Sequence, residues 1–262
     1  MIADAPRWVT IAGRSRYSPE VASREDWMKR LGPLYGGAVA LVHSTPWRWP
    51  QTIAADESRS SGWVVALGLP IGAIAAAVAA LVKAVGIPAP LAGILGLAAL
   101  TAASAALVER GVVERIDRAE PRSPSVTTIL VLVFATLVRA GAIISVPPER
   151  WLGVFIATAL VGRWAAVFLQ ALGDPILDDH APRSLVATPA PAWLTAALSL
   201  GVAALVVLAL GKAGIVVLAV TAAIAFGLGL DAQRRDRGLS SPIVACAAAI
   251  GELAVLLIAT MH

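Results

Sequence analysis

Long apolar stretches dominate the chain, and short polar clusters separate them. A transmembrane helix needs roughly 20 mainly apolar residues. Within lipid every backbone polar group must be satisfied, and these runs lack the alternation of barrel strands, so we expect helices. The pattern predicts an all-α polytopic membrane bundle of about seven transmembrane helices, at residues 62–84, 87–108, 126–147, 151–171, 192–211, 213–230 and 242–260.

A weaker apolar stretch, "LGPLYGGAVALVH" at 31–43, is too short to span a bilayer. We expect it to form a re-entrant or interfacial helix, with "SREDWMKR" before it as an amphipathic lead-in. The first 30 residues are polar and charged, without the apolar core of a signal peptide. The domain prediction is therefore a polar extension at 1–30 followed by one integral membrane domain at 31–262.

The composition agrees with a membrane protein. Of the 262 residues 58% are hydrophobic and 15% are charged, and the mean hydropathy is +0.79; soluble domains carry about 25% charged residues. The net charge of +4 is compatible with a nucleic-acid binder. The basic residues, however, flank apolar runs as topology signals do, so we expect a lipid bilayer and no nucleic acid as partner. Cys246 is the single cysteine, which excludes an intramolecular disulfide.

Lysine and arginine are distributed unevenly between the two sides of the predicted bundle. Eight precede residue 62 and four lie in 109–125, whereas the other side carries only Lys83, Arg150 and Lys212 in short turns. The positive-inside rule then places the N-terminus in the cytoplasm and the C-terminus outside, in the cytoplasmic (inner) membrane of a bacterium. All long polar loops then fall on the cytoplasmic face. They either form one shared site there or are ordinary solvated connections.

Arg139, Arg163 and Glu252 are ionisable residues that lie well inside predicted spans, away from their ends. Such residues are costly in lipid, and from mid-span they cannot reach the interface, so we expect them to face the bundle interior. Glu252 is expected to form an interior ion pair with one of the two arginines. The cluster is either a pocket in which arginine binds substrate phosphate or a buried pair that fixes helix register.

Carboxylates gather on two of the predicted cytoplasmic loops. Several carboxylates close together hold magnesium against substrate phosphates, as phosphoryl transfer requires. Glu114 and Asp117 are three residues apart and would share one face of a helix. Arginines accompany these acids, so the alternative is an ordinary loop in which acidic and basic side chains neutralise one another. We interpret His180 as a loop residue and not as a metal ligand. The two groups are Glu109, Glu114, Asp117 and Glu120, and Asp174, Asp178 and Asp179.

Several landmarks, in order from about residue 28, give the chain a family resemblance. A short apolar segment ends in "LVHSTP", "LPIG" leads into the first long span, and "RGVVERID" and "EPRSPS" follow the second. "VGRWAAV" and "RGLSSPIVACAAAIGE" come later. In this the chain resembles cobalamin synthase, or adenosylcobinamide-GDP ribazoletransferase, whose corresponding motifs are F-L-T-R-L-P, P-L-I-G, D-G-L-A-D-T-A-D-G, D-S-R-x-G-T-x-G, S-R and G-G-V-T-G-D-x-L-G-A followed by a glutamate.

The resemblance implies a magnesium-dependent transfer of phosphocobinamide from adenosylcobinamide-GDP to α-ribazole or its 5′-phosphate, with release of GMP. By matching position, the catalytic, metal-side residues are Glu114, Asp117 and Glu120. Arg122, Arg163 and Arg139 would contact phosphate. The chain is a divergent member, because Arg110 and Pro242 stand where the family has aspartates.

These two replacements leave other functions open. One alternative is a catalytically inactive relative, a pseudoenzyme that serves as a membrane scaffold and binds a partner protein through residues 1–30. A third hypothesis is a transporter of a small anion, based on the arginines inside the spans. The broken-helix pairs of inverted-repeat transporters are not evident in the sequence.

Overall fold

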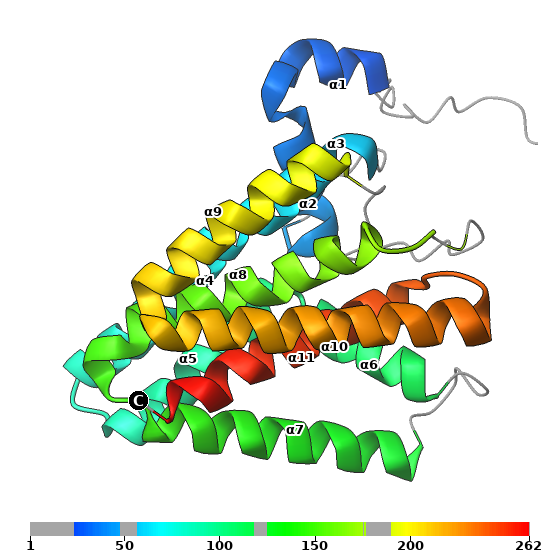
Figure 1. Ribbon diagram of the computed structural model, residues 1–262. Helices are drawn as coiled ribbons and strands as arrows, with labels where there is room; N and C mark the ends of the chain where they lie inside the picture. Colours follow the sequence, from blue (N-terminus) through cyan, green and yellow to red (C-terminus); the bar gives the residue numbers. More distant parts are fainter. Residues whose placement is uncertain (1–23, 48–56, 118–124, 175, 177–189, 262) are drawn as a thin grey trace, which may run out of the picture.

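The structure is a computed structural model that describes residues 24–47, 57–117, 125–174, 176 and 190–261 (Figure 1). Every regular element in these ranges is a helix, which confirms the all-α polytopic bundle. The helices are α1 (Arg24–Leu31), η1 (Gly32–Leu34), α2 (Tyr35–Ser44), α3 (Glu57–Ala66), α4 (Gly68–Ala84), α5 (Ala89–Ala103), α6 (Leu107–Ile116), α7 (Val126–Ser145), η2 (Pro148–Arg150), α8 (Trp151–Gln170), α9 (Ala192–Leu210), α10 (Lys212–Asp236) and α11 (Ser241–Ala259).

Length and composition allow 6 helices of the described chain to cross a membrane, or up to 7 if the bent pair of α5 and α6 counts as one span. This agrees with the predicted number, and the chain is a multi-pass membrane protein. The spans are Ser60–Ala84, Val126–Ser145, Pro148–Gln170, Ala192–Leu210, Lys212–Asp236 and Ser241–Ala259.

The predicted span at 87–108 is wrong in one respect, because the helix does not run through it. Helix α5 ends at Ala103, and α6 leaves it at an angle of 75°. Ala105 and Ala106 make the turn with φ values of 54° and 53°, in the left-handed region that L-residues avoid. No glycine or proline marks this position, so composition and apolar periodicity did not reveal the break.

The charged stretch 109–118, expected to be a loop, is helical as far as Ile116. Leu107, Val108 and Gly111 are buried against the bundle, whereas Arg110 and Glu114 are exposed. This spacing of three and four residues is the amphipathic period of a helix. The charges therefore mark the outer face of α6.

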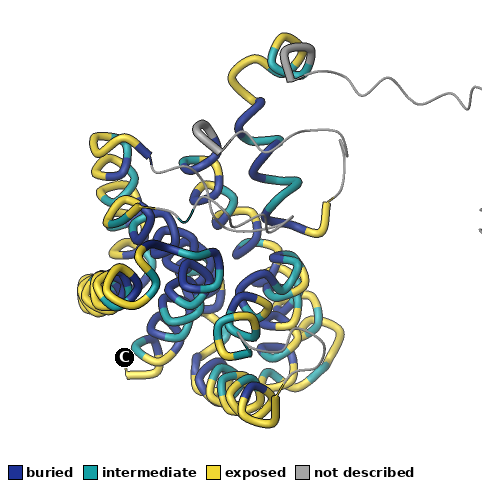
Figure 2. Tube along the Cα trace, turned by 90° about the vertical axis from the view of Figure 1, so that its right-hand side faces the viewer, coloured by how far each residue is buried: buried dark blue, intermediate teal, exposed yellow. Residues whose placement is uncertain are grey.

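Helix α8 lies at the centre of the bundle, and most of its residues are buried. Figure 2 shows the buried segments in the interior and the exposed ones on the outside. Two glycines let α4 approach α8 closely. A Cβ on Gly72 would lie 2.5 Å from Ile156 Cα, and one on Gly68 would lie 2.9 Å from Leu160 Cα. Small residues four positions apart allow this kind of backbone contact between membrane helices.

Helix α1 stands above the bundle in Figure 1, and α2 leads from it down to α3, where Gly37 lies against Trp63. Tyr35 and Val39 of α2 are buried against Trp27, Met28 and Leu31. Helix α2 has 10 residues and is about 15 Å long, too short to cross a bilayer; its interfacial or re-entrant position stays a prediction. Most of the predicted extension 1–30 lies outside the described residues.

Candidate functional site

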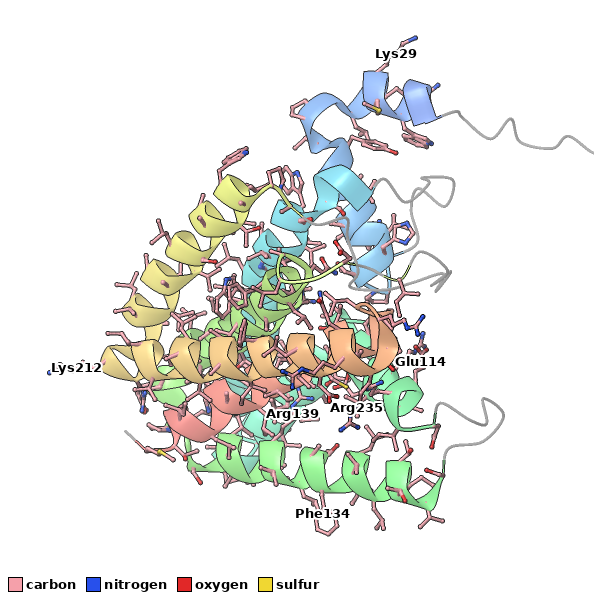
Figure 3. The ribbon with its side chains drawn as sticks, turned by 45° about the vertical axis from the view of Figure 1, so that its right-hand side comes forward. Lys29, Glu114, Phe134, Arg139, Lys212 and Arg235 are labelled. Carbon is pink, nitrogen blue, oxygen red and sulfur yellow. The ribbon has the colours of Figure 1, made fainter. Side chains whose placement is uncertain are left out.

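Arg139 on α7 joins three helices in the bundle core (Figure 3). Its Nη1 donates to Glu109 Oε1 on α6 at 2.8 Å, and its Nη2 donates to Glu252 Oε2 on α11 at 2.7 Å. The side chain of Glu252 is only 3% exposed. The sequence left open which arginine pairs with Glu252, and the structure assigns the direct contact to Arg139.

Arg163 on α8 belongs to the same core and is buried. Its Nη2 donates to Ser104 Oγ at 3.2 Å, and its Nη1 lies 3.4 Å from Ala159 O. Ser104 caps the C-terminus of α5, where a cation offsets the negative end of the helix dipole. Glu109 lies in the first turn of α6, where a carboxylate is favoured. At the break, the C-terminus of α5 therefore lies near a cation, Arg163, and the N-terminus of α6 near an anion, Glu109.

A glycine makes room for the buried carboxylate. A Cβ on Gly162, next to Arg163, would lie 2.6 Å from Glu252 Cγ. The two arginines and two glutamates Arg139, Arg163, Glu109 and Glu252, which we call the core network, together carry no net charge. Charges at membrane depth are tolerated when they face the interior and pair in this way.

A cavity of about 440 Å³ opens beside the core network, between α5, α6 and α7. Alanine and aliphatic residues form most of its wall, and four polar residues form the rest. Thr101 Oγ1 donates to Glu109 Oε1 at 3.1 Å. Glu109 Oε2 and Arg139 Nε are buried without a hydrogen-bond partner among the described residues. The polar residues of the wall are Thr101, Glu109, Thr136 and Arg139.

Asp117, a predicted metal ligand, holds the start of α7. Both of its carboxylate oxygens lie 3.2 Å from the backbone N of Ser125, and Oδ1 accepts from Thr128 Oγ1 at 2.6 Å. Hydrogen bonds from the side chains of Ser125 and Thr128, with the backbone bond from Ser125, lower the pKa of Asp117. The carboxylate is therefore ionised and already engaged as part of a helix cap.

The other charged residues of α6 lie at the same end of the bundle. Arg115 Nη1 contacts Asp236 Oδ2 on α10 at 3.1 Å, and its Nη2 is 3.9 Å from Asp231 Oδ2. Glu114 and Arg110 are exposed and make no ion pair within the described residues. Figure 3 shows Glu114 at the α6 end of the bundle, separated from Arg139.

The predicted metal residues are only partly placed. Glu120 and Arg122, with Asp178, Asp179 and His180, lie outside the described residues. Among those that are described, no three His, Cys, Asp or Glu residues are grouped to hold a metal ion. Magnesium usually needs only one or two carboxylates besides substrate phosphates, and Glu114 is exposed and open to such a role. Magnesium binding stays a prediction.

Two positions that the resemblance sets against aspartates, Arg110 and Pro242, lie near one helix crossing. Helices α6 and α11 cross so closely that a Cβ on Gly111 would overlap Ala245 Cβ, at 2.0 Å, and would lie 3.8 Å from Pro242 Cα. Arg110, Gly111 and Pro242, which the resemblance relates to two motifs more than a hundred residues apart, therefore occupy one crossing.

Sequence reasoning did not identify Thr101 and Ser104 as part of the site. Both hydroxyls contact charged members of the core network. Their position near the end of an otherwise apolar run was the available signal.

The fold and the core network define a multi-pass helical membrane protein with a broken helix and charges at membrane depth. Comparison with protein-family models, with curated proteins and with solved structures finds no match for this chain.

Proposed function

We propose that the chain is a divergent membrane transferase of the cobalamin synthase type, which transfers phosphocobinamide to α-ribazole or its 5′-phosphate and releases GMP. The observation that supports this is the convergence of the landmarks of the resemblance. Gly111 and Pro242 meet where α6 crosses α11, and Gly162 lies against Glu252 beside Arg163. Residues that carry the likeness in separate parts of the chain thus lie around one core.

The transfer would take place at the end of the bundle where α6 ends and α7 begins, which we expect to face the cytoplasm from the distribution of basic residues. There Glu114, with Glu120, would hold magnesium against the pyrophosphate, and Arg122 would contact phosphate. The metal would neutralise charge on the leaving nucleotide. In this proposal Arg139 and Arg163, already engaged in the core network, act through the position of α6, because Arg139 holds Glu109 and Arg163 holds Ser104 at the break.

The test is conversion of adenosylcobinamide-GDP and α-ribazole by membranes that contain the protein. We expect product with magnesium, no product with a chelator, and a loss with Glu114→Gln of about a hundredfold. Glu149→Gln is the matched control, because Glu149 is exposed in η2, away from the cytoplasmic face assigned here. No product under conditions in which an established family member works would contradict the proposal.

A specific observation favours the inactive-scaffold alternative. Asp117 is engaged by Ser125 and Thr128, and Arg110 is exposed at the position of the first family aspartate. If this alternative holds, the membranes give no product, and crosslinks from Lys29 reach a second protein in a complex of defined stoichiometry. Turnover by the isolated chain would exclude it.

The break between α5 and α6 bears on the anion-transporter alternative, since interrupted helices carry substrate sites in transporters. Glu109, however, occupies the first turn of α6, where such an anion would bind. Flux of chloride or phosphate into liposomes, compared between wild type and Arg163→Ala, decides this alternative. Flux that depends on Arg163 would replace the transferase proposal.

A further inference from the structure

The cavity beside the core network has a mainly apolar wall, and it opens toward the outer side of α5 and α7. Ala98 on α5 and Thr136 on α7 are both exposed and both line it. Small side chains leave the space free, which comprises about 440 Å³ and lies in the range of cavities that hold small molecules. The alanines of the wall are Ala98, Ala102, Ala105, Ala106 and Ala140.

The cavity lies at membrane depth. Arg139 follows the first residue of α7, Val126, by 13 positions, so it lies about 20 Å along a helix about 30 Å long. Helix α7 is a candidate membrane span, and its Phe134 points away from the bundle (Figure 3). A molecule that enters between α5 and α7 would therefore come from the lipid phase.

One end of the cavity is polar, and its character is that of a hydrogen-bond acceptor. Glu109 is 25% exposed and Arg139 only 14%. Both terminal nitrogens of Arg139 are used by carboxylates, whereas Glu109 Oε2 has no partner among the described residues. Glu109 is the more exposed of the two charged residues in the cavity wall, so a hydrogen-bond donor held in the cavity would solvate this carboxylate, whereas an apolar group would desolvate it.

We propose that this cavity binds an amphiphile from the bilayer, with an apolar chain along α5 and α7 and a neutral hydroxyl head that donates to Glu109. A head with a carboxylate or phosphate is disfavoured, because Arg139 is already matched by Glu109 and Glu252. An alkane would desolvate the Glu109 carboxylate in the cavity wall without offering it a hydrogen bond. The left-handed turn at Ala105 and Ala106 lines the cavity, and strain of this kind is often found at ligand sites.

The probe is hexadecanol with a photoactivatable diazirine in its chain, added to the full-length protein in nanodiscs. Peptide mass spectrometry then locates the label. Unlabelled hexadecanol, hexadecanoate and hexadecane are the competitors, which separate recognition of the hydroxyl head from general partition into lipid. The variant Ala98→Phe fills the cavity, and Ala204→Phe is the matched control, since Ala204 is also an exposed alanine, on α9.

We expect the label on α5 and α7 peptides that line the cavity, and a yield about tenfold lower in Ala98→Phe but unchanged in Ala204→Phe. Hexadecanol should compete, and hexadecanoate and hexadecane should not. Equal labelling of all lipid-facing helices, or an unchanged yield in Ala98→Phe, would overturn the site. Competition by hexadecanoate as strong as by hexadecanol would overturn the hydroxyl head. Labelling does not depend on turnover, so this inference stands or fails apart from the transferase.

Discussion

Arg139 on α7 and Glu252 on α11, 113 residues apart in the sequence, form an ion pair with 2.7 Å between Nη2 and Oε2. Arg139 also contacts Glu109 on α6, so a single guanidinium connects the broken helix to two long helices. Removal of one partner from such a buried pair leaves an uncompensated charge, which costs more than the pair itself contributes.

We therefore expect Glu252→Leu to lower the free energy of unfolding by about 3 kcal/mol or more. Stability should fall because Arg139 would keep only Glu109 as a partner, and because the nearby buried Arg163 would lose the negative charge of Glu252. Unfolding in mixed detergent micelles measures it. Glu149→Leu, at an exposed position in η2, is the control and should change stability by less than about 0.5 kcal/mol. Equal losses in the two variants would show that the core network contributes little.

Asp117 should give the start of α7 a pH dependence. Its folded-state pKa lies below the ordinary value, so its stabilising effect is complete above about pH 4 and is lost as the pH falls through the lowered pKa. Protection of the first-turn amides of α7 from hydrogen exchange, corrected for intrinsic rates, should be lower in Asp117→Asn than in wild type at neutral pH. This difference should shrink below about pH 4. A difference that persists in acid would contradict the role of the ionised carboxylate.

Gly111 allows α6 to cross α11. A Cβ at this position would lie 2.0 Å from Ala245 Cβ, so Gly111→Ala should lower stability by about 1–3 kcal/mol through overpacking. Adding Ala245→Gly should restore much of the loss, because it removes the opposing methyl group. Gly141→Ala on α7 is the control: nothing lies within 4 Å of its Cβ position, so this change should stabilise the helix by about 0.5 kcal/mol. A double variant as unstable as Gly111→Ala would contradict the predicted contact.

Ala106 tests the strain at the break. Its φ of 53° is accessible to glycine without penalty, whereas a β-branched side chain is strongly disfavoured there. Melting temperatures should fall in the order Ala106→Gly, wild type, Ala106→Val. If Ala106→Val and the wild type have the same melting temperature, Ala106 does not keep its left-handed conformation in the folded protein.

The apolar runs were sufficient to predict an all-helical membrane protein, because membrane insertion depends on the length and hydrophobicity of each segment. The positions of Arg139, Arg163 and Glu252 within these runs were enough to place them in the interior, since a charge at membrane depth requires a polar partner. For Ser60–Ala84, α7, α8, α9 and α11, these local properties gave nearly the observed bounds, whereas α10 continues past its predicted end at 230 to Asp236.

The break at Ala105 and Ala106 was decided only by the tertiary structure. Neither residue favours a left-handed turn; the close crossing of Gly111 on Ala245 and the bond from Arg163 to Ser104 hold α5 and α6 in separate directions. The roles of the acids were decided in the same way. Asp117 has the charge of a metal ligand, but it accepts hydrogen bonds from Ser125 and Thr128, 8 and 11 residues further along the chain. These contacts depend on how α6 and α7 are placed relative to each other, which the apolar pattern alone does not give.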